Sequence, residues 1–107
     1  MKLFTINGKE YKAKPFDFNL VCDLEDMGVP MNEMGRKRMS LTRAYFALCA
    51  GISNEAAGKE LEAHAIAGGT FEDINIALSV EMEKSDFFRT LTQTAEEEVT
   101  TDQSEEK

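Results

Sequence analysis

The sequence predicts an α+β protein that is mainly helical: an N-terminal β-hairpin, a compact bundle of about four helices and a disordered acidic tail. Three observations predict it. An Asn-Gly pair lies between alternating β-forming residues near the N-terminus, four later segments repeat apolar residues at helical spacing, and the last residues are acidic without periodicity. The 107 residues fit one domain, which we place at residues 1–90, with the tail at 91–107.

The hairpin prediction rests on the first twelve residues. Leu3-Phe4-Thr5-Ile6 alternates in polarity, and Asn7-Gly8 follows it directly. A type I′ turn needs positive φ at both central residues, which Asn and Gly tolerate. Because an isolated hairpin is marginally stable, we expect the face that carries Phe4 and Ile6, with Tyr11 opposite or nearby, to pack on the helices.

The first two helices are separated by a loop at Val29–Asn32. Asp17 is the expected N-cap of the first helix, and Gly28 is its expected C′ residue. The second helix is predicted from about Met34 to Ala50 and ends at Gly51. The expected buried positions of the two helices are Leu20, Val21 and Leu24 in the first and Leu41, Ala44, Tyr45, Leu48 and Cys49 in the second.

The third helix should begin after Ser53 as N-cap, with Glu55 in its first turn, and end at Gly68-Gly69. Its expected inner face is a thin stripe of small residues. Thr70-Phe71-Glu72-Asp73 has the form of a capping box and opens the fourth helix. The inner faces are Ala57, Leu61 and Ala65 in the third helix and Phe71, Ile74, Ala77, Leu78 and Met82 in the fourth.

Ile76 and Val80 fall on a different side of the fourth helix from its inner face. One interpretation is a contact between subunits, since an apolar excess on a surface marks interaction sites. The other is that this helix packs against both the hairpin and a neighbouring helix. The sequence leaves both open.

Charge is distributed unevenly along the chain. The formal net charge is −8, and residues 94–107 hold six acids and one base, leaving 14 acids and 11 bases before them. This balance argues against binding nucleic acid, which needs clustered Lys and Arg, and against an anionic membrane surface. No export signal and no apolar run of ~20 residues is present, so the expected compartment is the cytoplasm.

No constellation of reactive residues stands out. His64 is the single histidine, and Cys22 and Cys49 lie far from it in the sequence, whereas a metal site needs several converging ligands. The thiols are expected to be reduced and apolar in role. Nucleophile and phosphate-binding motifs are absent, and the pairs Asp23/Asp26 and Glu81/Glu83 fit solvated helix faces. We therefore expect no catalytic, cofactor-binding or metal-binding residues.

Candidate protein-binding residues fall in three places. Phe87-Phe88 could anchor a partner, because buried aromatics dominate interfaces; alternatively one packs inward and the other closes the gap to the hairpin. Met31 and Met34 could offer adaptable apolar surface or cover the core. Arg36, Lys37 and Arg38, joined by Arg43, could dock an acidic partner or the acidic tail of this chain or of a neighbour; alternatively they are an ordinary solvated helix start. With Ile76 and Val80, the candidate binding residues are Phe87, Phe88, Ile76, Val80, Met31, Met34, Arg36 and Arg38.

The order of these features resembles a known family. The segments are LFTINGKEY, FDFNLVCDLEDMG, ALCAGISNEAAGKELEAHAIAGGTFEDINIAL and SDFFR, followed by the acidic tail. Over residues 3–93 the chain is similar to the short tail assembly chaperones that phages and prophages of the siphophage type encode between the major tail protein and the tape measure protein. The matching motifs are patterns of apolar, glycine and capping residues.

The resemblance implies a non-enzymatic protein of the bacterial host cytoplasm without cofactors. Such a protein binds tape measure protein and keeps it soluble while the tail tube assembles. It further implies self-association along this client and, through a longer frameshifted form, contact with the tail tube protein. The alternatives are another small phage structural or adaptor protein of the head–tail connector type, a small enzyme, or an acidic mimic of nucleic acid.

Overall fold

The computed structural model describes residues 3–91. A two-stranded antiparallel hairpin is followed by helices, which confirms the mainly helical α+β class. A further helical stretch covers residues 86–91. The predicted acidic tail lies almost wholly outside the described residues. In chain order the elements are β1 (Leu3–Ile6), β2 (Lys9–Lys12), α1 (Phe18–Asp26), the 3-10 turn η1 (Met31–Glu33), α2 (Arg38–Ala50), α3 (Asn54–Ile66) and α4 (Glu72–Lys84).

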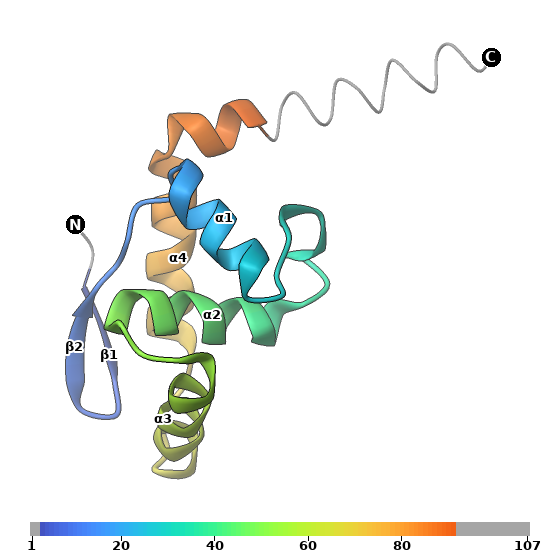
Figure 1. The fold of residues 1–107 in the computed structure, drawn as a ribbon. Helices are drawn as coiled ribbons and strands as arrows, with labels where there is room; N and C mark the ends of the chain where they lie inside the picture. Colours follow the sequence, from blue (N-terminus) through green and yellow to red (C-terminus); the bar gives the residue numbers. More distant parts are fainter. Residues whose placement is uncertain (1–2, 92–107) are drawn as a thin grey trace.

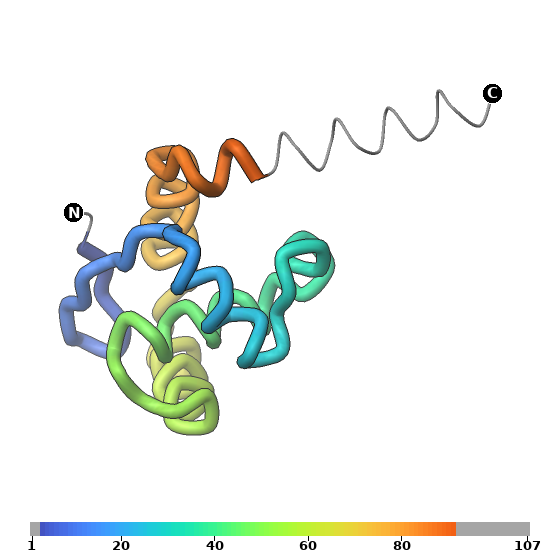
Figure 2. The backbone as a smooth tube through the Cα atoms, turned by 45° about the horizontal axis from the view of Figure 1, so that its top comes forward, coloured from blue at the N-terminus to red at the C-terminus, as the bar shows by residue number. Residues whose placement is uncertain are grey.

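Helix α2 lies at the centre of the fold. It contacts α1, α3, α4 and β2, while α4 and α3 also contact β1. Figure 1 shows α2 crossing the middle of the molecule, with α1 and α3 on opposite sides of it, α4 running behind it and the hairpin at one end. The start of α1 and the end of α4 lie side by side in the views of both Figure 1 and Figure 2.

The hairpin forms as the Asn-Gly pair predicts. Asn7 has φ 54° and Gly8 has φ 83°, the positive values that a type I′ turn requires. The strands pair Phe4 with Tyr11 and Ile6 with Lys9. Phe4 and Ile6 are fully buried, and the ring centroids of Tyr11 and Phe46 of α2 lie 5.0 Å apart. The expected packing of the hairpin's apolar face on a helix is confirmed.

Side chains from α3 and α4 fasten the hairpin. The Asp73 carboxylate accepts a hydrogen bond from the Thr5 N–H at 3.1 Å, and His64 Nδ1 accepts one from the Asn7 N–H at 2.9 Å. The expected capping box is therefore wrong in detail, because Asp73 faces the hairpin and not Thr70. The Thr70 hydroxyl instead accepts a 3.4 Å hydrogen bond from the Glu72 N–H.

His64 has a structural role. Its Nε2 lies 2.8 Å from the Thr70 carbonyl oxygen, so Nε2 donates there while Nδ1 accepts from Asn7, which fixes one neutral tautomer. Gly69 makes room for this ring, since a Cβ built on it would lie 2.4 Å from His64 Nε2. His64 thus joins the hairpin turn to the connection between α3 and α4.

Replacing Gly69 with Ala should lower the free energy of unfolding by about 1–2 kcal/mol, because the displaced imidazole loses two hydrogen bonds of roughly 1 kcal/mol each. Urea denaturation followed by circular dichroism measures the loss. Gly35→Ala is the matched control, because a Cβ there meets nothing within 4 Å. Equal stability of the two variants would contradict the role given to His64.

Helix α2 begins at Arg38, four residues later than the predicted start at Met34. Residues 34–36 form a turn after η1, and Lys37 has a non-helical backbone with φ −103° and ψ 56°, so the helix starts after it. The Glu33 carboxylate pairs across this turn with Arg36 at 2.9 Å and with Lys37 at 3.0 Å. The hydrogen bond from Lys37 is the main reason that the pKa of Glu33 lies below its ordinary value, and the charge of Arg36 contributes.

The buried positions of α2 cover more of its circumference than the predicted stripe does. Leu41, Ala44 and Tyr45 are buried as expected, but Leu48 and Cys49 are half-buried. The pattern missed a second buried set, which consists of Thr42, Phe46 and Ala47. Neighbours on several sides explain this difference, because an enclosed helix has no single inner face.

The caps of α1 and α3 are confirmed. Asp17 Oδ1 accepts from the Leu20 N–H at 2.9 Å, and Ser53 Oγ accepts from the Ala56 N–H at 3.1 Å. Each satisfies one of the unpaired N–H groups that open a helix. The three helices α1, α2 and α3 end one or two residues before glycines, as predicted.

The Tyr45 hydroxyl donates a 2.7 Å hydrogen bond to the Lys14 carbonyl, inside the core where Tyr45 is fully buried. Burial raises the pKa of Tyr45 well above its ordinary value, and burial also raises the pKa of Cys49. A raised folded-state pKa means that the unfolded chain loses the proton first as pH rises. The contribution of protonated Tyr45 to the free energy of unfolding is therefore fully present below pH ~10 and is lost progressively above it.

We expect the free energy of unfolding to fall at alkaline pH, first through Cys49 and then, above pH ~10, also through Tyr45, which contributes about 1.4 kcal/mol per pH unit. Tyr45→Phe should remove that contribution, leave the one from Cys49, and cost about 1–2 kcal/mol at neutral pH, since the Lys14 carbonyl loses its donor. Urea titrations between pH 8 and 11 measure both effects. An unchanged alkaline slope in the variant would refute the assignment.

Candidate protein-binding surface

Large apolar side chains are exposed at several positions in residues 3–91. Isolated exposed apolar residues are ordinary, whereas groups of them at a groove mark sites for polypeptides or ligands. The exposed fractions are Leu3 47%, Phe18 63%, Met39 69%, Ile52 36%, Ile66 80% and Ile76 44%. Met39 and Phe18 matter most, because Met39 lines a groove and Phe18 contacts a residue that lines another.

The first groove, which we call the α2–α3 groove, has a volume of about 410 Å³. Small residues on α3 leave this space between the helices. Ala65 was expected in the core, but it is exposed and lines the groove. The groove is lined by Met39, Ser40, Thr42 and Arg43 of α2, by Gly58, Leu61, Glu62 and Ala65 of α3, and by Phe71.

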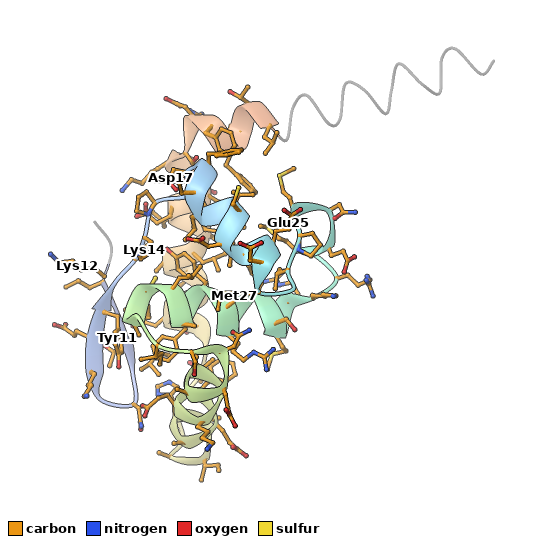
Figure 3. The ribbon with its side chains drawn as sticks, viewed as in Figure 1. Tyr11, Lys12, Lys14, Asp17, Glu25 and Met27 are labelled. Atoms are coloured by element: carbon orange, nitrogen blue, oxygen red, sulfur yellow. The ribbon has the colours of Figure 1, made fainter. Side chains whose placement is uncertain are left out.

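The second groove, the α4 groove, has a volume of about 320 Å³ and lies where the start of α1 meets the end of α4. Figure 3 shows Asp17 at this place, at the first turn of α1. The Ser85 hydroxyl donates to the Phe16 carbonyl and so fastens the end of α4 to the segment before α1. The lining residues are Pro15, Phe16, Asp17, Glu81, Lys84, Ser85 and Phe87.

Glu81 corrects a sequence expectation. The pair Glu81/Glu83 was read as a solvated helix face, but only Glu83 is exposed, whereas Glu81 is 3% exposed. Glu81 Oε2 lies 3.4 Å from Lys84 Nζ. Helical periodicity places Glu81 on the same face as Ala77 and Leu78, which are buried. The carboxylate therefore lies at the edge of the core and lines the α4 groove.

Phe87 and Phe88 point to different places. The Phe88 ring packs on the buried ring of Phe16, with centroids 5.4 Å apart, so one aromatic packs inward as the sequence allowed. The Phe87 ring packs edge-to-face on Phe18 at 5.6 Å and lines the α4 groove. Of the two alternatives for the second aromatic, closing the gap to the hairpin is not the one that the ring contact supports, because Phe87 packs on Phe18 of α1. Phe87 is thus the better placed of the two for a partner.

The remaining candidates divide by burial. Ile76 is exposed and Val80 is half-buried, and neither lines either groove. Met34 is 6% exposed and belongs to the core, while Met31 is half-buried and packs against it. The interpretation of these methionines as residues that cover the core is confirmed for both.

The basic residues near the start of α2 differ in their partners. Arg36 and Lys37 are both engaged by Glu33. Arg38 and Arg43 are exposed on α2, and Arg43 lines the α2–α3 groove. The structure therefore divides the basic residues into two that share the Glu33 carboxylate and two further exposed arginines on α2.

Two residues of the surface, Met39 and Phe18, were missed by sequence reasoning. Both lie on helices but outside the apolar stripe that faces the core. An apolar residue out of phase with its helix is the signal that could have found them, as it does for Ile76 and Val80.

Both cysteines are free and half-buried. Within residues 3–91, no three His, Cys, Asp or Glu side chains gather so that they could hold a metal ion. In the same part of the chain, no helix combines the length and apolar character needed to cross a membrane.

A comparison with protein-family models, with curated proteins and with solved structures finds no match to this chain.

Proposed function

We propose that this chain is a non-enzymatic polypeptide-binding protein, a phage tail assembly chaperone that holds tape measure protein soluble in the host cytoplasm while the tail tube assembles. The single observation that carries the proposal is the α2–α3 groove. It is open, about 410 Å³ in volume, and lined by apolar atoms of Met39, Leu61, Ala65 and Phe71. An open apolar groove between helices suits the apolar face of a client helix.

The surroundings of the groove fit a chaperone that must bind weakly and repeatedly. Met39 offers a flexible, polarisable side chain, which adapts to different apolar partners. Arg43 and Glu62 line the same groove, so charges of both signs are available to client side chains. A formal net charge of −8 would keep several copies on one client soluble.

The proposal extends to two further contacts. Several copies would associate along one client, with the exposed Ile76 as a candidate contact between copies. A longer frameshifted form would recruit the tail tube protein. Both follow from the resemblance to tail assembly chaperones over residues 3–93.

Co-expression with the tape measure protein of the same phage or prophage tests the proposal. We expect the client to move from the insoluble to the soluble fraction and to co-purify with this chain. A client that stays insoluble and does not co-purify would refute the proposal. Presence of this chain in mature virions would also count against it and favour an adaptor of the head–tail connector type.

A further inference from the structure

Glu81 is the most buried charged side chain among those the structure describes, and its pairing is weak. Its hydrogen-bond partner within residues 3–91 is Lys84 Nζ at 3.4 Å, longer than the ~2.7–2.9 Å of a good charge-assisted hydrogen bond. The Lys84 side chain is 57% exposed, whereas that of Glu81 is 4% exposed. A buried carboxylate is costly unless it is well paired.

The interior offers Glu81 no better partner. The Tyr45 hydroxyl, which faces this region from α2, donates to the Lys14 carbonyl. Burial raises the pKa of both Tyr45 and Cys49, and the negative charge of Glu81 raises each further. Both groups are therefore protonated and uncharged near neutral pH, and neither neutralises the carboxylate.

The α4 groove opens on this carboxylate and has the lining that a basic side chain needs. Pro15 and Phe87 supply apolar walls for an aliphatic stem, and Asp17 adds a second carboxylate. The faces of aromatic rings attract cations, and the flat guanidinium of arginine both stacks on rings and pairs with carboxylates through two N–H groups.

We propose that the α4 groove binds a basic side chain of the client polypeptide, an arginine in particular, with Glu81 as its counter-ion and Phe87 as its aromatic wall. This inference rests on the proposed function for the source of the arginine. Lys84 occupies the outer side of the carboxylate in the free protein and gives way when the client arginine binds. The α2–α3 groove takes the apolar part of the client, and the α4 groove adds selectivity for a positive charge.

A titration with Nα-acetyl-arginine methylamide, followed by ¹H–¹⁵N NMR, tests the site directly. We expect shifts concentrated at the amides of Ser85 and Phe87, and none with the neutral probe Nα-acetyl-norleucine methylamide. Glu81→Gln should weaken arginine binding at least about ten-fold, as expected for loss of a charge-assisted pair. Glu83→Gln, the same change on the exposed side of α4, should leave binding unchanged.

Lys84→Met should change the affinity for the arginine probe in the opposite direction from Glu81→Gln. If Lys84 competes with the client arginine, this variant should bind the arginine probe several-fold more tightly than the native chain. Weaker or equal binding by Lys84→Met would overturn the proposal, as would equal shifts with the two probes or equal affinity of Glu81→Gln. Thermal melting of each variant shows that the fold is intact before affinities are compared.

Co-expression separates this inference from the proposed function. If the native chain solubilises tape measure protein and Glu81→Gln does so equally well, the arginine site is wrong while the chaperone function stands. If Glu81→Gln alone loses the client and Glu83→Gln keeps it, both hold. If the native chain fails, the proposed function is wrong, and the probe titration still decides whether the groove binds arginine.

Discussion

Replacing Phe16 with Ala should lower the free energy of unfolding by about 3–5 kcal/mol, the largest stability effect that we expect from a single substitution. Phe16 is fully buried, and its ring packs on Tyr45 at 5.5 Å and on Phe88 at 5.4 Å. It thus joins the core helix α2 to the stretch that follows α4. Domains of this size have only about 5–15 kcal/mol of stability in total.

Phe18→Ala is the matched control, because the same ring is removed two residues away from an exposed site. Phe18 is 63% exposed and contacts Phe87, so the variant should stay within about 1 kcal/mol of the native chain. Urea denaturation of the two variants at neutral pH gives the comparison. Similar losses from the two substitutions would mean that the aromatic core is placed wrongly.

Ala65→Glu should reduce the amount of tape measure protein that co-purifies with this chain at least about ten-fold, the largest functional effect that we expect from one substitution. The new carboxylate would lie in the α2–α3 groove, where an apolar client would bury it without a partner at a cost of several kcal/mol. Because Ala65 is exposed, the fold should tolerate the change. The measurement is the ratio of client to chaperone after affinity purification.

Ala63→Glu supplies the control for this prediction. Ala63 is also exposed on α3, two residues away, and it does not line the α2–α3 groove. Both substitutions add one negative charge near the end of the same helix, so their effects on helix stability should be similar. Equal loss of client from both variants would show that charge, and not the groove, determines binding.

Local signals in the sequence predicted much of the fold. Asn7-Gly8, Asp17 and Ser53 each specify a turn or a cap through their own backbone preferences and short-range hydrogen bonds. All three perform in the structure the roles that the sequence assigned to them. The order of strands and helices could be read for the same reason.

Local backbone geometry and long-range contacts set the features that the sequence did not predict. Lys37 has a non-helical backbone, so α2 starts only at Arg38, and nothing in the periodicity of the segment shows this. Asp73 leaves its expected cap because the Thr5 N–H of the hairpin lies within reach. Residue spacing shows what is possible within a helix, but not which neighbour competes for a side chain.

The candidate surface could be predicted only in part. Phe87 could be identified because two adjacent aromatics on a helix cannot both face one core. Ile76 could be identified because the apolar residues of its helix lie on two faces. The grooves arise from the meeting of α2 with α3 and of α1 with α4, so their positions depend on tertiary packing. Burial of Glu81 and Met34 likewise depends on which helices cover them.

The central claim is that a client polypeptide occupies the α2–α3 groove, and methionine methyl groups report on it most directly. With ¹³C-methyl methionine and a soluble paramagnetic agent, the Met39 methyl of the free chain should relax strongly and that of Met34 weakly, since they are 69% and 6% exposed. In the complex with tape measure protein, the Met39 methyl should become as protected as that of Met34. A Met39 methyl that stays as accessible in the complex as in the free chain would contradict the account.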